Sequence, residues 1–434
     1  MDLRNHGGEG RPDGIMKEKK TRFYYGYVVT AAGFTIMLVG GGTHTPSFGV
    51  FLKPIVEEFG WSRAQAALGY SLSVFAQGIL AIGMGWLTDK LGPRLVAMVL
   101  GSFLGVCYIL MSGVTALWQF QLNYAFFGAI GASTVMVPIM ATVSRWFIRR
   151  RGLMLGIVQA GLALGGLFFP PIAGRLILSY GWRTAYLMTG IVTIGGMILA
   201  GFFLRRDPRD MGLSADGEED VLYTQAKETA RSLRSSVTDV TGIMKHRSFW
   251  MMAGVYGIFG FCRTTFTSHV TAHVQDLGFS ITEGANALAI IGGSSMFARV
   301  GMGRLADKIG SIPGFIISFA ITALSLALGL FAQELWMIYL FAFVFGVGWG
   351  NEAVLRYSLT SEVFGLTSIG LILGILAVGE ALAAAFGSYF AGYLFDLFGS
   401  YRAAFWMGIV ISLFGALLVW LLSPMVRAKD RLPY

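Results

Sequence analysis

The stretch Gly85-Trp86-Leu87-Thr88-Asp89-Lys90-Leu91-Gly92 returns in altered form as Gly303-Arg304-Leu305-Ala306-Asp307-Lys308-Ile309-Gly310, an offset of 218 residues (303 − 85). Residues 59–62 (Phe-Gly-Trp-Ser) return at 277–280 (Leu-Gly-Phe-Ser) with the same offset. Residues 182–186 return at 401–405, one residue further along. Three matches in nearly one register indicate that the chain consists of two related halves.

The sequence around these repeats is strongly apolar. Of 434 residues, 55% are hydrophobic and 13% charged, whereas soluble proteins carry about 25% charged residues. This composition excludes a disordered or fibrous chain and argues against a soluble enzyme.

A membrane-spanning helix needs about 20 mostly apolar residues. The sequence predicts twelve such segments: Tyr27–Phe51, Leu68–Leu87, Leu95–Thr115, Leu117–Val143, Leu153–Leu178, Thr184–Leu204, Phe249–Gln275, Ala285–Gly303, Pro313–Ala332, Leu335–Leu359, Ser368–Phe395 and Tyr401–Ser423. The expected fold is an all-α integral membrane protein with two pseudo-symmetric six-helix bundles.

The distribution of Lys and Arg predicts the orientation in the membrane. The two tails and the loops on their side carry 25 of these residues, the opposite loops carry 5, and 3 lie within helices. Because Lys and Arg accumulate on the cytoplasmic side, both termini are expected in the cytoplasm of a cell (inner) membrane protein. We expect tails at 1–26 and 424–434, bundles at 27–204 and 248–423, and a cytoplasmic linker at 205–247.

The repeated Gly-x-Leu-x-Asp-x-[Leu/Ile]-Gly pattern resembles the signature loop of the major facilitator superfamily. Two further stretches, Tyr25-Gly26-Tyr27 and Arg145–Gly161, resemble the monocarboxylate transporters and the related oxalate/formate exchangers. The resemblance covers the whole chain. It implies a transporter of small carboxylates that works with a proton or by exchange with another anion.

The first signature loop supplies the predicted gating residues. Gly85 allows helix ends to approach closely, and Asp89 and Arg94 are expected to form a charge pair that holds one half against the other. Asp307 is the equivalent in the second half, where Ile312 replaces the arginine. Solvated charges in a tight turn are the alternative interpretation.

Charged residues within membrane helices are costly and are therefore functional candidates. The resemblance implies that Arg299 engages the substrate carboxylate, which a guanidinium can hold with two parallel hydrogen bonds. A structural ion pair within the same half is the alternative. Arg263, His44 and Asn351 are expected to contribute to the same substrate site.

Three residues are candidates for proton coupling: Glu380, Glu352 and His269. The resemblance to the oxalate exchangers aligns Glu380 with the second cationic residue of their site. A titratable carboxyl in place of that cation suits a monoanion carried with a proton. A permanent salt bridge of Glu380 to Arg299 or Arg263 is equally compatible with the sequence. The spacing of Glu352 and Arg356 favours a pair within one helix.

The sequence therefore predicts a proton-coupled symporter of monocarboxylates that works by alternating access. The alternatives are an anion exchanger and a proton-driven exporter of hydrophobic drugs. The chain has no ATP-binding loop and no evident catalytic constellation. We expect no enzyme activity, no metal and no cofactor. The expected partners are a small carboxylate, a proton and the lipid bilayer, with no nucleic acid and a functional monomer.

Overall fold

The computed structural model describes residues 24–148, 150–215, 244–364 and 369–429. The N-terminal half crosses the bundle six times, and short π-helical turns interrupt three of the crossings. The elements are α1 (Gly26–Ile36), η1 (Met37–Gly41) and α2 (Gly42–Phe59); α3 (Arg63–Leu91); α4 (Pro93–Leu95), η2 (Val96–Leu100) and α5 (Ser102–Ser112); α6 (Leu117–Asn123), η3 (Tyr124–Gly128), α7 (Ala129–Ser133) and α8 (Val137–Trp146); and α9 (Arg151–Phe203), which makes two crossings joined by a kink at Gly181. The short 3-10 turn η4 (Pro208–Met211) follows.

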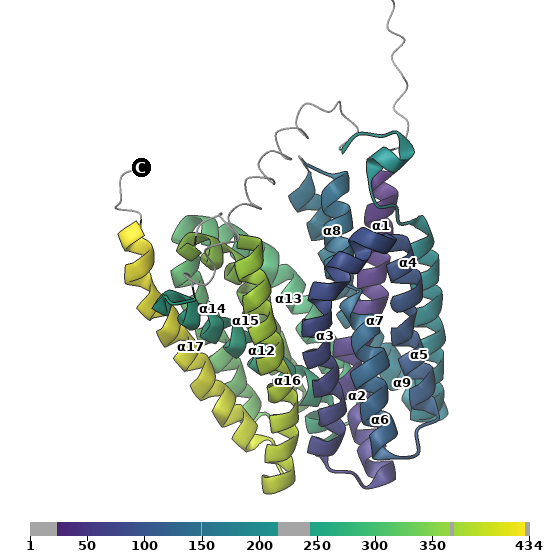
Figure 1. Ribbon diagram of the computed structural model, residues 1–434. Helices are drawn as coiled ribbons and strands as arrows, with labels where there is room; N and C mark the ends of the chain where they lie inside the picture. The colour runs from purple at the N-terminus through teal and green to yellow at the C-terminus, as the bar shows by residue number, and fades with distance from the viewer. Residues whose placement is uncertain (1–23, 149, 216–243, 365–368, 430–434) are drawn as a thin grey trace, which may run out of the picture.

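The C-terminal half makes six crossings with one long helix each. They are α12 (Arg247–Asp276), α13 (Ile281–Ile309), α14 (Ser311–Phe331), α15 (Leu335–Phe364), α16 (Ile369–Phe398) and α17 (Arg402–Lys429). Twelve crossings in two bundles confirm the predicted fold class (Figure 1). Residues 1–23 and 430–434 of the predicted tails and residues 216–243 of the predicted linker lie outside the described residues. Helix α17 continues to Lys429, beyond the expected end of the second bundle at residue 423.

Most of these helices have the composition of membrane spans. In the described ranges, eight helices are long and apolar enough to cross a membrane, or nine if the bent α3 is included. Helices α12 and α13 are not among them. These two helices carry Arg263, His269 and Arg299. The polar residues within these two helices lower their mean hydropathy, and such residues within a membrane helix are functional candidates.

The internal repeat extends to backbone detail. Ser62 and Ser280 each begin a helix, α3 or α13, with a reciprocal capping box to the residue three positions on. Gly92 and Gly310 end those helices, both with φ of 84°. Serine side chains satisfy the free N–H groups of a helix start, and glycine tolerates positive φ. The same local chemistry therefore sets the length of the corresponding helix in both halves.

The two halves share a core at only one end. The first described residues and the end of α17 lie on one side, which we call the terminal face; the opposite side is the far face (Figure 1). One apolar cluster includes Phe48 and Tyr186 from the N-terminal half together with Phe266 and Phe405 from the C-terminal half. Two other clusters, around Trp146 and around Tyr256 and Leu359, each belong to one half.

Close backbone contacts hold the far ends of the halves together. A Cβ added at Gly392 of α16 would lie 2.8 Å from the backbone nitrogen of Ala64 in α3. A Cβ at Gly49 of α2 would lie 2.9 Å from the carbonyl oxygen of Ser268 in α12. Only glycine allows such approach without displacing the neighbouring helix. The structure is therefore closed at the far face, and the bundles lean apart toward the terminal face (Figure 1).

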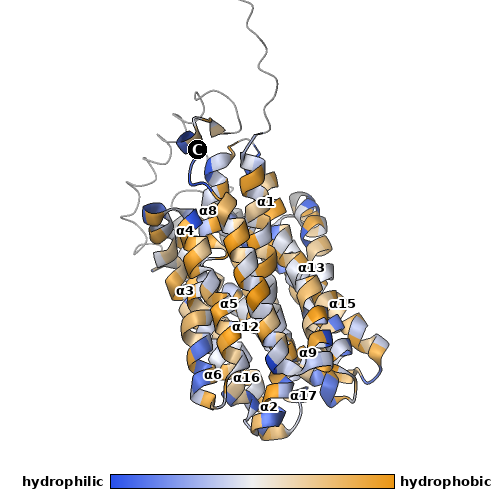
Figure 2. Cartoon of the chain, turned by 90° about the vertical axis from the view of Figure 1, so that its right-hand side faces the viewer, coloured by the Kyte–Doolittle hydropathy of each residue, from blue (hydrophilic) through white to orange (hydrophobic). Residues whose placement is uncertain are grey.

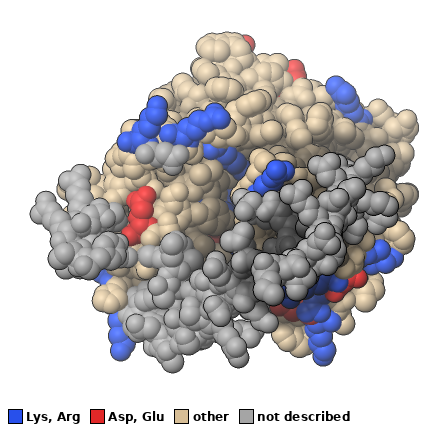
Figure 3. All heavy atoms as spheres, turned by 90° about the horizontal axis from the view of Figure 1, so that it is seen from above, with Lys and Arg blue, Asp and Glu red and all other residues tan. Residues whose placement is uncertain are grey.

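The outer surface matches a bilayer. Apolar residues cover the sides of the bundle, and hydrophilic residues gather toward its ends (Figure 2). Large apolar side chains such as Trp118, Leu199 and Trp420 are more than half exposed. Seen from above, Lys and Arg outnumber Asp and Glu among the visible described residues of the terminal face (Figure 3). This excess agrees with the charge asymmetry from which the orientation was predicted.

Candidate transport site and gates

Arg299 and Arg263 lie within helices without a countercharge. Neither guanidinium has an ion pair or a hydrogen bond to a described residue, and the buried Nε of Arg299 has no partner there. The Arg299 guanidinium lies 5.7 Å from the centre of the Trp349 ring, a cation–π contact that leaves its hydrogen-bond donors free. These positive charges can accept an anionic ligand.

Glu380 is held by Arg356. Its carboxylate forms an ion pair with the Arg356 guanidinium, and each side chain is 14% exposed. The guanidinium also lies 4.7 Å from the centre of the Phe259 ring. The salt bridge of Glu380 to Arg299 or Arg263 that the sequence allowed is therefore not formed; the partner is Arg356. The expected Glu352–Arg356 pair is also wrong, because Arg356 reaches across to α16 instead.

Glu352 is buried away from that ion pair. Its carboxyl oxygen accepts a hydrogen bond of 2.8 Å from Thr322 in α14, and the residue is 3% exposed. No cation lies within ion-pair distance of it in the described part of the chain. The neighbouring Asn351 is also buried. Because a lone buried carboxylate is costly while a protonated one is tolerated, Glu352 is a suitable proton carrier.

His44 lies between helices of the N-terminal half. The first crossing is irregular just before this residue, where the π-helical turn η1 precedes α2. His44 Nε2 lies 3.1 Å from the Ser73 hydroxyl, so the side chain forms an interhelical hydrogen bond. A part in substrate binding stays a prediction.

The expected charge pair in the signature loop is wrong. Asp89 forms an ion pair with Arg145 of α8, inside the N-terminal half. Arg94 instead places its guanidinium 4.3 Å from the Phe202 ring. The turn at Gly92 and Pro93 starts a new helix and directs Arg94 toward α9. The Asp89 pair therefore does not bridge the two halves in this conformation.

The other predicted gating residues give less information. A Cβ added at Gly85 would make an ordinary contact of 3.7 Å with Val137, so close packing does not require glycine there. The side chain of Asp307 lies outside the described part of the structure. Their gating roles remain predictions.

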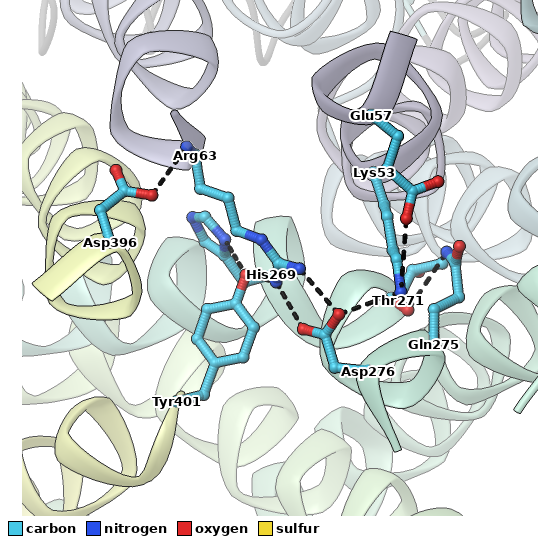
Figure 4. Close-up of polar contacts among 9 residues, drawn as sticks. All are labelled: Lys53, Glu57, Arg63, His269, Thr271, Gln275, Asp276, Asp396 and Tyr401. Carbon is cyan, nitrogen blue, oxygen red and sulfur yellow. Dashed lines mark hydrogen bonds and ion pairs between the residues drawn. The ribbon is translucent and has the colours of Figure 1, made fainter. Parts of the chain in front are cut away.

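The halves are bridged at the far face by a cluster that the sequence analysis missed. We define the far-face cluster as Lys53, Arg63, His269, Asp276, Asp396 and Tyr401 (Figure 4). The Arg63 guanidinium donates hydrogen bonds of 2.6 and 2.7 Å to the two carboxylate oxygens of Asp276. It donates a third, of 2.7 Å, to the Tyr401 hydroxyl. Arg63 belongs to the N-terminal half, and both partners belong to the C-terminal half.

Two more contacts strengthen this bridge. Lys53 of α2 adds a 3.0 Å contact to Asp276. Asp396 of α16 accepts the backbone N–H groups of Arg63 and Ala64 at 2.9 Å and so caps α3 from the other half. Burial opposes the ionisation of Asp276, but its bonds to Arg63 and Lys53 outweigh burial and hold its pKa below the ordinary value. The carboxylate is therefore charged at neutral pH and keeps the bridge closed.

The sequence contained a weak signal for this cluster. Arg63 directly follows the capping Ser62, and Asp276 directly precedes the repeated segment 277–280. Both residues lie outside the predicted membrane-spanning segments. Nothing in the sequence shows that residues 213 positions apart would meet.

A two-bundle helical membrane protein with uncompensated cations inside and an ion-pair bridge at one face has the architecture of a secondary transporter. The chain belongs to the major facilitator superfamily, whose model matches residues 24–313 and 294–433. This confirms the first resemblance. The proteins of this family that it resembles are transporters, and the chain is not an enzyme.

Individual members of the family show which transporters this chain is similar to. Monocarboxylate transporter 13 of Rattus norvegicus is 27% identical over 380 residues, covering 87% of this chain and 84% of that protein. The agnestins efflux protein AgnL12 of Paecilomyces divaricatus is 23% identical over 92% of this chain and 87% of its own length. The solved structure of a bacterial homologue of the human lysosomal transporter Spinster, in an inward-facing and unoccupied conformation, has a TM-score of 0.72 at 16% identity. The match covers 95% of this chain and 100% of that chain. The resemblance to the monocarboxylate transporter clade is thus confirmed.

Proposed function

We propose that the protein carries small organic anions, most simply monocarboxylates, across the membrane together with protons. The observation that carries this proposal is the pair of uncompensated arginines, Arg299 and Arg263. A buried cation without a partner is costly, and a substrate carboxylate supplies the missing charge with suitable geometry. The similarity to monocarboxylate transporters supports the same substrate class.

We propose Glu352 as the main proton carrier. Glu380 is tied to Arg356, and releasing it would strand a buried guanidinium. Glu352 has only the Thr322 hydroxyl as a partner, so it can take up and release a proton without breaking an ion pair. His269 is a second proton site, linked to the far-face cluster.

Alternating access requires that the two faces open in turn. We assign the terminal face to the cytoplasm because of its excess of Lys and Arg, which makes the present conformation inward-facing. The far-face cluster is then the closed outer gate. The similarity to the inward-facing structure of the Spinster homologue supports this assignment. The protein would work as a monomer in the cell membrane.

Anion exchange is the second candidate. If Arg263 and Arg299 are both uncompensated, an empty site carries two positive charges that repel each other, which disfavours the return of an empty carrier. Net accumulation of anion driven by a proton gradient supports symport, whereas uptake that occurs only against internal anion supports exchange.

A thermal-shift screen of the purified protein against small mono- and dicarboxylates tests the proposal. A ligand that binds only the folded state raises the melting temperature. Arg299→Lys keeps the charge but loses the two-pronged geometry, so it should weaken carboxylate binding by about tenfold or more. Arg304→Lys, on the same helix but exposed, is the matched control and should bind normally. Unchanged binding in Arg299→Lys, with transport of hydrophobic compounds, would favour a drug exporter instead.

A further inference from the structure

Hydrogen-bond donors and acceptors in the far-face cluster are ordered in a definite direction. His269 Nε2 lies 2.8 Å from the Ser388 carbonyl oxygen, which can only accept, so Nε2 carries the hydrogen of the neutral ring. His269 Nδ1, 2.9 Å from the Tyr401 hydroxyl, is therefore the acceptor. The Tyr401 oxygen in turn accepts from Arg63. One unbroken chain thus runs from Arg63 through Tyr401 to His269 (Figure 4).

A proton on His269 conflicts with this chain. Once Nδ1 is protonated it donates to the Tyr401 oxygen, which already accepts from Arg63. The hydroxyl hydrogen of Tyr401 must then turn away from His269, and the imidazolium charge lies one hydroxyl group from the guanidinium. The proton comes from hydronium in the water at the far face: one O–H bond of hydronium breaks as the Nδ1–H bond forms, and no covalent bond of the protein breaks. In the closed state, protonation of His269 therefore weakens the hydrogen bond between Arg63 and the Tyr401 oxygen.

A small cavity can receive the displaced hydroxyl hydrogen. Tyr401 and His269 both line it, together with His273, Thr265 and Phe405. His273 Nε2 and the Thr265 hydroxyl oxygen are buried and have no hydrogen-bond partner among the described residues. The Thr265 hydroxyl oxygen can accept a hydrogen bond, and His273 Nε2 can accept one in the tautomer that carries its hydrogen on Nδ1, so the cavity offers acceptors for a rotated Tyr401 hydroxyl or for a water molecule.

Charged groups from every neighbouring helix act on His269. Arg63 of α3 opposes a charge on the ring, whereas Asp276 of α12 and Asp396 of α16 favour it. Lys53 of α2 contacts Asp276 and so reduces the help that this carboxylate gives. The two carboxylates stay beside His269 on its own half when the gate opens, but Arg63 leaves with the other half. Opening therefore removes the opposing charge.

We propose that His269 is a proton-binding residue that controls the outer gate through Tyr401 and Arg63. Protonation of His269 weakens the hold of the C-terminal half on Arg63, and by linkage the open gate binds the proton more tightly than the closed gate. The proposal rests on the proposed function only in calling the far face the outside. Acidic conditions outside would then open the gate toward the side from which the proton comes.

The distance across the gate measures this response directly. Spin labels at Leu122→Cys in α6 and Leu397→Cys in α16 report it, since both residues are more than half exposed and the native Cys107 and Cys262 are buried. The full chain in nanodiscs, without substrate, is measured between about pH 8 and about pH 5, the range in which histidine titrates. The longer-distance population should rise about tenfold or more at the lower pH.

Variants separate His269 from its neighbour. His269→Gln keeps a donor and an acceptor but cannot titrate, so its distances should not change with pH. His273→Gln lies one turn away, outside the hydrogen-bonded chain. Its amide oxygen can still accept a rotated Tyr401 hydroxyl although the side chain cannot titrate, so this variant should keep the full response. If His269→Gln does not fold, Tyr401→Phe replaces it and should lose at least half of the response. A full response in His269→Gln or Tyr401→Phe, or loss of the response in His273→Gln alone, overturns the proposal.

The outcome does not depend on the substrate. A normal pH response in a protein that binds no carboxylate would leave the gate proposal standing and contradict the proposed function. Carboxylate binding without a pH response of the gate would support the proposed function and contradict the gate proposal.

Discussion

Arg63 and Asp276 are joined across the two halves by a pair of hydrogen bonds, of 2.6 and 2.7 Å. Arg63 is the first residue of α3 and Asp276 the last residue of α12. The pair closes the far face, and the described residues contain no ion pair between the halves at the terminal face. One two-pronged contact thus makes the molecule asymmetric across the membrane. Weakening it should shift the protein toward the opposite conformation.

Asp276→Asn tests this relationship. It removes the charge that Arg63 and Lys53 share, so the label distance between positions 122 and 397 should lengthen at neutral pH. Glu57→Gln is the matched control, since Glu57 contacts Lys53 at only 3.7 Å and its side chain is 64% exposed. Equal distances in Asp276→Asn and the unsubstituted protein would show that the pair does not hold the gate.

The lowered pKa of Asp276 determines the pH range in which the Arg63–Asp276 pair keeps the far face closed. Its pKa is below the ordinary value in the closed state. The contribution of the pair to closure is therefore complete above the ordinary carboxyl pKa, about 4, and is lost only as pH falls through the lowered value. In a His269→Gln background the gate should stay closed down to about pH 4 and open below it. Opening of that variant near pH 6 would contradict this assignment.

Glu380→Gln should destabilise the fold. Removing one member of a buried ion pair leaves the other uncompensated, at a cost of about 3–5 kcal/mol. We expect a lower melting temperature, measured on the purified protein. The double variant Glu380→Gln with Arg356→Gln should recover part of the loss, because no charge is then stranded. If Glu380→Gln is fully stable and transports without proton coupling, Glu380 is the proton carrier after all.

Glu352→Gln should separate binding from coupling. The amide keeps the shape and the hydrogen bond to Thr322 but cannot exchange a proton. The variant should bind carboxylate and exchange labelled substrate across proteoliposome membranes, yet fail to accumulate it against a proton gradient. Glu362→Gln, a substitution on the same helix near the terminal face, is the control. Normal accumulation by Glu352→Gln would move the coupling role elsewhere.

Asp89→Asn should slow transport more than it weakens binding. Asp89 lies at the terminal face with Arg145, in a pair whose side chains are 57% and 30% exposed. Exposed pairs contribute about 1 kcal/mol or less to stability, so the melting temperature should hardly change. Arg145→Gln should have the same effect on transport, and the double variant should be no worse than either single one. Lost binding with a normal rate per bound substrate would argue against a gating role.

Membrane orientation can be checked by cysteine labelling in intact cells. With an impermeant reagent, Glu57→Cys at the far face should react, whereas Asp210→Cys, which follows the N-terminal bundle, should react only after permeabilisation. Both positions are exposed. The opposite pattern would reverse the orientation and make the far-face cluster an inner gate.

Local patterns in the sequence were enough to predict the twelve helices and the two related halves. Hydrophobic length, the serine caps at Ser62 and Ser280, and the glycines at Gly92 and Gly310 act over a few residues, so they can be read locally. The candidates Arg299 and Arg263 could be found in the same way, because a charge within an apolar stretch stands out.

The ion-pair partners of these charged residues depend on the three-dimensional fold. Glu380 pairs with Arg356, Asp89 with Arg145, and Arg63 with Asp276. Sequence spacing had favoured partners one helical turn apart or within one loop. Ion-pair partners depend on how each helix is rotated and shifted against its neighbours, and that is set by packing contacts distributed over the whole bundle, such as the glycine at 392 against α3. The outer gate lies where two distant helix ends come together, so no local pattern could reveal it.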